Sequence, residues 1–272
     1  MASIYDLVSL SDYKNYMSLS QTTDDLRIQT LITSVSRAIL TRLNRGNLLP
    51  TPYLEVRNGM GQSAFFLDNW PVTSISSLTI NGHLISPIRT DTDISWCGSG
   101  YILDEFDEQP PGKPQMVTLR GVRCHHGIGN IQIAYTAGYQ VNEAVNLSSA
   151  AACAVTVKQP YGAWAKDIFV VDTNSRVFTT VTSNPQSGQY TVDQGNYLFS
   201  TADIGTQLLI TYAYIPADIA LVAMDWIADR QAYLNRIGYS SKSLGGQETV
   251  SYLVKAIPDF VDGILRQYMK VM

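Results

Sequence analysis

The sequence predicts an α+β protein, because helical and strand periodicities occupy separate stretches of the chain. Apolar residues recur at three- and four-residue steps near both ends, whereas the stretches between them alternate at every second residue. Glycine and asparagine turns separate the alternating runs. We therefore expect a helical bundle, made of an N-terminal hairpin and C-terminal helices, together with a β region and an inserted small β-sandwich or barrel domain.

The N-terminal helical hairpin is predicted over residues 9–44. Ser9 and Asp12 form a capping box that opens a short helix to about Leu19. Residues 22–25 open a second helix, where two aspartates match the positive end of the helix dipole. Residues 44–46 are expected to close it, because asparagine and glycine tolerate left-handed geometry.

The middle of the chain predicts strands with a period of two. Asn81-Gly82 is a strong hairpin signal between its flanking runs, and Asn58-Gly59 is expected to be the turn of an earlier pair. Residues 110–114 are a proline-rich loop. The expected strands of this first β region cover residues 53–57, 63–67, 75–80, 83–88, 96–103, 115–120 and 130–135.

A second β unit is predicted over residues 150–214, after a linker at residues 141–149 that is polar and small. Residues 131–139 and 208–216 both read as strands leading toward a helix, but only the second reaches one. We therefore expect a domain of residues 141–214 inserted into a core of residues 1–140 and 215–272. Its strands are expected at residues 154–157, 168–172, 177–181, 189–192, 196–200 and 207–212.

The last part of the chain predicts a helix over residues 216–237, a polar arm, and a short helix over residues 257–268. The arm is interpreted as an extended segment that orders on a partner, with a flexible loop as the alternative. Its residues are Ser240, Ser241, Lys242, Ser243, Leu244, Gly245, Gly246, Gln247, Glu248, Thr249, Val250, Ser251 and Tyr252. The residues expected to pack the helices are Leu31, Val35, Ile39, Val222, Trp226 and Tyr233.

Composition limits the classes of function. Hydrophobic residues make up 45% of the chain and charged residues only 15%, so a buried core is expected. Sixteen tyrosines suit either surfaces that contact partners or a β-rich fold. A net charge of −4 without a basic block argues against nonspecific DNA binding as the main role. Three widely spaced cysteines argue against a disulfide scaffold, and we expect neither a signal peptide nor a membrane span.

Two segments carry residues typical of catalytic or metal sites. Cys124-His125-His126 could bind zinc with Cys97 or His83, but neighbouring residues on a strand point to opposite faces. The carboxylate run at residues 104–108 precedes a proline-rich stretch and is interpreted as a solvated loop. We therefore expect no cofactor, no metal site and no catalytic residues.

The order of several motifs resembles bacteriophage head–tail connector proteins, the adaptor or neck rings beneath the portal. The opening helices resemble those of that family, and residues 67–82 resemble its apolar-Pro-Val turn and hairpin. Residues 135–139 are similar to the strand that usually precedes its C-terminal helix. Here a β unit intervenes before that helix, and residues 188–205 resemble a segment found in several phage structural proteins.

The resemblance implies a structural virion protein at the neck, made in the host cytoplasm. Identical copies would form a ring, matching the portal's twelve-fold symmetry as a dodecamer, and would dock under the portal protein. The ring would extend the channel through which DNA passes without sequence-specific binding, and would join the capsid to a downstream neck or tail protein. The arm at residues 240–252 would contact the portal or a neighbouring copy.

A different class of function remains open at the level of the sequence. The chain could be a tail or receptor-binding protein whose β domain, residues 141–214, recognises a host-surface carbohydrate. Tyr161, Trp164 and Tyr190 would then stack on sugars. A hydrolase, the third class, would need a pocket with paired carboxylates or a catalytic triad.

Overall fold

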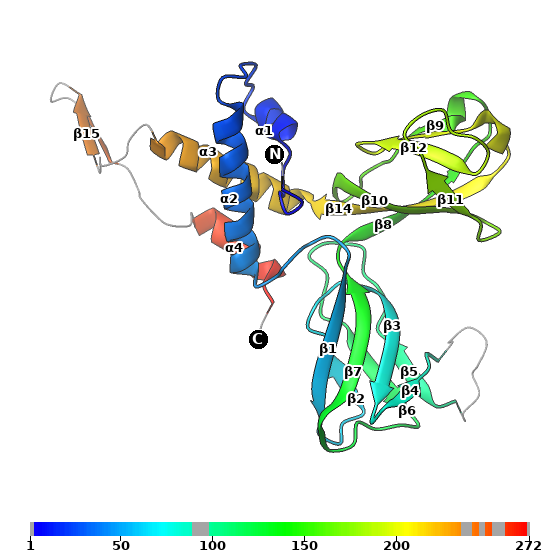
Figure 1. Cartoon of the computed structure of the whole chain (residues 1–272). Coiled ribbons are helices and arrows are strands. Elements are labelled where there is room, and N and C mark those ends of the chain that lie inside the picture. The colour runs from blue at the N-terminus through cyan, green and yellow to red at the C-terminus, as the bar shows by residue number, and fades with distance from the viewer. Residues whose placement is uncertain (1–2, 89–97, 235–240, 245–247, 252–258, 271–272) are drawn as a thin grey trace. The chain divides into compact units, whose positions relative to one another are not determined.

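The computed structural model describes residues 3–88, 98–234, 241–244, 248–251 and 259–270 (Figure 1). These residues form both helices and β-sheets, which confirms the α+β class. The chain divides into two compact units, one of Met1–Gly46 with Ala217–Met272 and the other of Asn47–Pro216. The insertion of residues 141–214 into a core of residues 1–140 and 215–272 stays a prediction.

The first unit consists of helices α1 (Leu10–Tyr16), α2 (Asp25–Leu43), α3 (Ala217–Leu234) and α4 (Asp259–Tyr268). Ser9 caps α1 as predicted, because its hydroxyl accepts a 3.0 Å hydrogen bond from the Asp12 N–H. Asn44 follows α2 in the left-handed conformation, with φ of 54°. Gly238, expected to end the third helix, lies outside the described residues.

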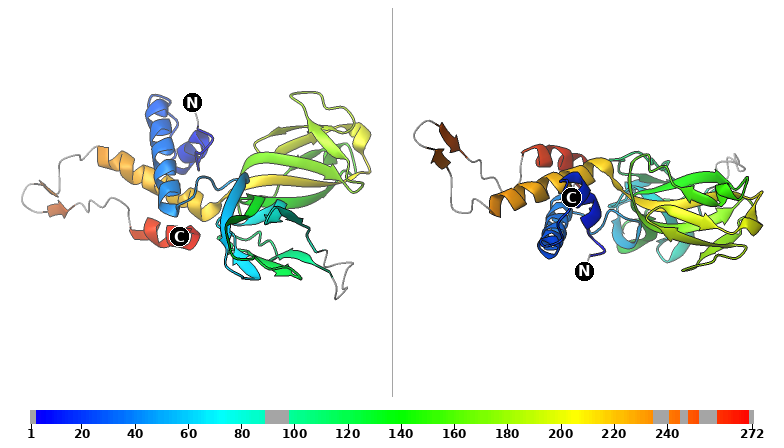
Figure 2. Two further views of the ribbon diagram at one scale, coloured as in Figure 1. Left: turned by 60° about the horizontal axis from the view of Figure 1, so that its bottom comes forward. Right: turned by 90° about the horizontal axis from the view of Figure 1, so that it is seen from above.

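Helices α2 and α3 cross and contact each other (Figure 2). Among the residues expected to pack the helices, four are buried and two, Leu31 and Tyr233, are half-buried. The four buried side chains are Val35, Ile39, Val222 and Trp226.

Polar contacts join the N-terminal helices to the C-terminal ones. The Tyr13 hydroxyl on α1 donates to Gln231 on α3 at 2.8 Å. The Arg45 Nε, just after α2, donates to the Tyr268 carbonyl at 2.9 Å, and the Tyr268 hydroxyl donates to Asp218 at 2.7 Å. Residues more than two hundred positions apart are therefore held in one unit by hydrogen bonds as well as by apolar packing.

Seven strands of the second unit form two sheets in its first half. One sheet has the order β1 (Thr51–Gly59), β7 (Gly127–Ala137), β3 (Val72–Ile80), β4 (His83–Ile85), and every pair is antiparallel. The other has the order β2 (Ala64–Phe66), β6 (Met116–Arg120), β5 (Gly100–Leu103).

The hairpin predicted at Asn81-Gly82 is confirmed. Ile80 of β3 pairs with His83 of β4, and the two turn residues have φ of 52° and 77°. The turn predicted at Asn58-Gly59 is wrong, because both residues belong to β1. That strand pairs with β7 and places Gly59 opposite Gly127, whereas β2 pairs with β6.

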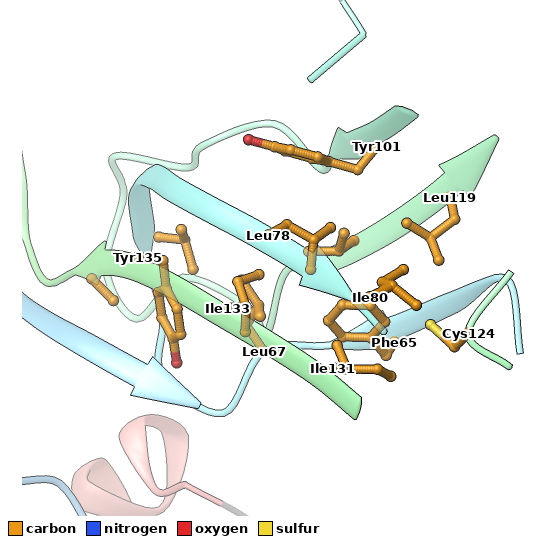
Figure 3. Packing of buried hydrophobic residues seen from close by; sticks show 13 residues of the cluster. Phe65, Leu67, Leu78, Ile80, Tyr101, Leu119, Cys124, Ile131, Ile133 and Tyr135 are labelled. Carbon is orange, nitrogen blue, oxygen red and sulfur yellow. The ribbon is translucent and has the colours of Figure 1, made fainter. Parts of the chain in front are cut away.

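The two sheets enclose one hydrophobic core (Figure 3). Gln115 is buried at its margin, where its Oε1 accepts from the Val72 N–H and its Nε2 donates to the Asp104 carbonyl at 3.1 Å. This side chain therefore ties β3 to the segment before β6. The core consists of Phe65, Leu67, Val72, Leu78, Ile80, Tyr101, Val117, Leu119, Cys124, Ile131, Ile133, Tyr135 and Ala137.

The second half of this unit is a single seven-stranded sheet. All neighbouring strands are antiparallel except β11 and β12, which are parallel. The order is β8 (Gln140–Asn146), β14 (Gln207–Pro216), β10 (Gly162–Asp172), β11 (Val177–Thr180), β12 (Gln189–Asp193), β13 (Asn196–Phe199), β9 (Ala154–Thr156).

The predicted linker at residues 141–149 is wrong, because most of it is strand β8. Val141 is buried and Val145 is half-buried, while the residues between them include an asparagine and a glutamate that conceal the alternation. β8 pairs with β14 along its whole length, and the Thr211 hydroxyl donates to Asn142 across the pair at 2.8 Å. A distant strand therefore decides the structure of this polar segment.

The two edge strands of this sheet approach each other. Directly after β9, the Lys158 N–H donates to the carboxylate of Glu143 on β8 at 2.9 Å. The sheet is thus nearly closed into a barrel.

Inside this barrel, Asp167 of β10 accepts two tyrosine hydroxyls. Tyr190 of β12 donates at 2.6 Å, and Tyr197 of β13 donates at 2.8 Å. Both rings are buried, and burial raises the pKa of both phenols. The carboxylate therefore fixes three strands by hydrogen bonds inside an otherwise apolar core.

Replacement of Ile39 by alanine should destabilise the helical unit. The side chain is fully buried on α2, and its loss is expected to lower the free energy of unfolding by about 2–5 kcal/mol. Leu26→Ala is the matched control, because Leu26 lies on the same helix but is exposed, and should change this free energy by less than about 0.5 kcal/mol. Denaturant unfolding followed by helical circular dichroism measures both, and equal losses would contradict the observed packing of α2.

Asp167→Ala should destabilise the nearly closed barrel. Two buried hydroxyls lose their acceptor, and a cost of about 2–4 kcal/mol is expected because each orphaned group costs about 1–3 kcal/mol. The control is Asp193→Ala, since that carboxylate is exposed at the end of β12. Denaturant unfolding followed by tyrosine fluorescence provides the comparison. A variant as stable as the control would show that Asp167 does not hold the strands.

Candidate interaction surfaces

The polar arm predicted near the C-terminus contains a β-hairpin. Strands β15 (Ser241–Leu244) and β16 (Glu248–Ser251) pair antiparallel, with Ser241 opposite Ser251. Within the described residues no third strand joins them, so both outer edges present backbone donors and acceptors. A two-stranded hairpin alone is marginally stable in water. Residues 240, 245–247 and 252 of the predicted arm lie outside the described residues, and its role in docking stays a prediction.

Strand β1 presents apolar side chains outward from the edge of its sheet. Leu54 is 71% exposed and Val56 is 58% exposed. Between them, Glu55 points the other way, accepts a hydrogen bond from Tyr135 and is paired with Arg57 at 2.7 Å. On this part of β1, the polar side chains of Glu55 and Arg57 face inward and are bonded within the chain, whereas the aliphatic side chains of Leu54 and Val56 face solvent. Such a face is typical of a protein contact.

One end of the first β region combines an arginine and two histidines with exposed apolar side chains. We call Met60, Arg123, His125, His126 and Ile128 the basic tip, and all five side chains are exposed. Ile128 is 95% exposed and Met60 71% exposed. The segment after β1 and the segment between β6 and β7 are joined by a hydrogen bond, in which the Gly61 N–H donates to the Cys124 carbonyl at 2.6 Å.

The structure separates the residues of the Cys124-His125-His126 segment. Cys124 lies in the hydrophobic core, where burial raises the pKa of its thiol, while both histidines are exposed. In the part of the chain that the structure describes, no group of three or more histidine, cysteine or acidic side chains could hold a metal ion. Cys97, one of the proposed additional ligands, lies outside that part.

The carboxylate run at residues 104–108 forms the start of the connection between β5 and β6. The Asp104 carboxylate accepts from the Met116 N–H at 3.0 Å, and the Tyr214 hydroxyl donates to the Glu108 carbonyl at 2.5 Å. Nearby, the Tyr139 hydroxyl donates to a proline carbonyl of the same connection at 2.7 Å. These bonds fix the backbone of the connection, and the side chains of Glu105 and Asp107 are exposed on it.

The three aromatic residues considered for carbohydrate stacking do not form an open platform. Tyr190 is 1% exposed and bonded to Asp167, so its ring is unavailable to a sugar. Tyr161 and Trp164 are half-buried, the first beside Tyr214 and the second donating to the Tyr197 hydroxyl. The structure therefore does not favour a sugar site on these residues.

Sequence analysis did not identify the basic tip as a surface. It considered residues 124–126 only as possible zinc ligands, and nothing in the local pattern marks Ile128 as more exposed than Ile131 and Ile133 of the same strand. The available signal was an isoleucine between two glycines, preceded by an arginine and two histidines. Among the described helices, none is long and apolar enough to cross a membrane.

Comparison with known proteins identifies the family. The family model described as "Head completion protein" matches residues 6–162, which is more than half of the chain. A comparison with curated proteins found no match. The matching solved structures include a chain from the "Neck of empty GTA particle computed with C6 symmetry". It has 10% sequence identity, a TM-score of 0.38, and coverage of 100% of this chain and 94% of that chain, and a likeness at this score does not establish a shared fold.

The family match extends from before α1 into the start of β10. It includes the opening helices and the first β region, whose motifs carry much of the resemblance to head–tail connectors. The expected relationship to head–tail connector proteins is confirmed, and so is the expected location of the chain at the head–tail interface of a virion. The chain belongs to the head completion protein family.

Proposed function

We propose that this chain forms a ring of identical copies under the portal, extends the DNA channel and joins the capsid to the tail. Its role is structural and involves no catalysis. The observation that carries the proposal is the head completion family match over residues 6–162. The resemblance to connector proteins suggests twelve copies, one for each portal subunit.

Exposed apolar side chains support a protein that functions in contact with partners. Leu54 and Val56 on β1 and Ile128 at the basic tip are exposed, although the chain has only 15% charged residues to keep it soluble. Single exposed apolar residues are common on protein surfaces. Two neighbours on the outer face of an edge strand are more typical of an interface.

We further propose that residues 141–214 are a domain inserted into a connector core that contains the helical bundle. The chain enters this region on β8 and leaves it on β14, and these strands are neighbours, with Gln140 opposite Ala213. Adjacent entry and exit points are the geometry that tolerates an insertion.

The hairpin β15–β16 is the proposed arm toward the portal or a neighbouring copy. A hairpin with two unpaired edges can add to the edge of another sheet, where backbone hydrogen bonds supply affinity with little demand on side chains. Packing of this kind would also supply the support that a lone hairpin lacks.

The proposed ring can be tested by locating the chain in assembled particles and by measuring its complex with the portal. In particles, antibody labelling or image reconstruction should place the chain at the neck in a closed ring beneath the portal. Native mass spectrometry of the full chain mixed with purified portal should give a complex with the symmetry of the portal. The proposal would be overturned if the chain were found elsewhere in the particle, or if it did not bind the portal at any concentration.

Thr249→Pro tests the arm. Proline removes a backbone donor from β16 and restricts the strand, so binding to portal should weaken about tenfold while thermal unfolding of the helices stays unchanged. Thr249→Ala is the matched control because it keeps every backbone donor, and it should bind within about twofold of the unmodified chain. Equal binding by both variants would remove strand addition as the docking mode.

A further inference from the structure

The first β region carries opposite charges at the two ends of β6. The acidic connection, which we define as residues 104–108, precedes β6, and the basic tip follows it. β6 pairs with β5 from Arg120 opposite Gly100 to Val117 opposite Leu103, so the loops at its two ends lie on opposite sides of the region. The region is therefore electrically polar along this strand.

Neither set of charges is neutralised within the part of the chain that the structure describes. In those residues Arg120 and Arg123 form no ion pair, and the carboxylates of Glu105, Asp107 and Glu108 form none either. Elsewhere in the described residues, the half-buried Lys14 and Arg57 each pair with a carboxylate. Within the residues that the structure describes, both sets of charges are therefore available to pair with opposite charges on another copy.

The basic tip also has the composition of a protein contact. Ile128 at the start of β7 and Met60 just after β1 are exposed, and burial of such aliphatic groups supplies contact energy that a phosphate backbone cannot. The loops are held in place by the bond from the Gly61 N–H to the Cys124 carbonyl and by the Asn130 side chain, which accepts from the Gly59 N–H at 2.7 Å. The tip is thus presented on a fixed backbone.

We propose that the basic tip of one copy docks on the acidic connection of a second copy of this chain. The proposal rests on the ring proposed above and names the surfaces that would form it. Because tip and connection lie at opposite ends of β6, each copy offers one of each, and repetition of the same contact gives the head-to-tail interface that a cyclic ring requires. The charges select the partner and its orientation, while Ile128 and Met60 are buried in the contact.

Arg123→Glu and Glu105→Lys test the contact from its two sides. Both side chains are exposed and form no hydrogen bond or ion pair within the described residues, so neither change threatens the fold. Each reversal should lower the number of copies bound per particle about three- to tenfold at low salt, as expected for the loss of one surface ion pair and the gain of a repulsion. The loss should shrink as salt screens the charges.

Combining the two charge reversals distinguishes loss of this specific contact from a general defect in folding or assembly. A chain with both substitutions should assemble again, because its acidic tip meets a basic connection. An equal mixture of the two single variants should also assemble, since each surface of one variant then matches the opposite surface of the other in alternation. Lys166→Glu, which reverses an exposed cation on β10, is the matched control and should bind like the unmodified chain.

The outcomes separate this inference from the proposed function. If the unmodified chain is absent from necks, the proposed function fails and the contact fails with it. If the unmodified chain is present and the reversals leave its copy number unchanged, or if neither exchange restores assembly, only the contact is overturned. Loss on Arg123→Glu without loss on Glu105→Lys would assign the tip to another polyanion, such as DNA, and would also overturn it.

Discussion

A backbone constraint at Gly138 sets the connection between the two β regions. This residue lies between β7, the central strand of the first region, and β8, the first strand of the second. Its φ is 150°, and a Cβ there would lie 2.3 Å from the backbone of Leu49 and Pro50. Only glycine permits this approach. The direction in which the chain leaves the first region, and hence the start of the second sheet, depends on it.

Tyrosine is the main means by which this fold places polar groups inside its cores. Eight of the largest fully buried side chains are tyrosines, and several hydroxyls bond to a specific acceptor, such as Asp167 for Tyr190 and Tyr197 and the Glu108 carbonyl for Tyr214. A ring buries a large apolar area, while its hydroxyl fixes position and register. The abundance of tyrosine therefore reflects, in large part, the interior of the fold.

The exposed features of the fold agree with membership of a family of structural proteins. The exposed features are an edge strand with Leu54 and Val56 outward, a hairpin that no other described strand joins, and a β region with opposite charges at the two ends of β6. Each is unusual for a protein that acts alone and suits one that closes into an assembly.

Local signals in the sequence determined the features that depend on near neighbours. Ser9 as a cap, Asn44 at the end of α2 and the turn at Asn81-Gly82 follow from hydrogen bonds and dihedral angles within a few residues. The tertiary structure alone decided which strands share a sheet, why residues 141–146 form β8, and why Tyr190 is buried. Those outcomes depend on partners far away in the chain, such as Thr51 and Ala137, which are 86 residues apart. It also decided that Arg123 and Glu105 lie at opposite ends of one strand, since a sequence gives their types but not the direction in which the folded backbone presents them.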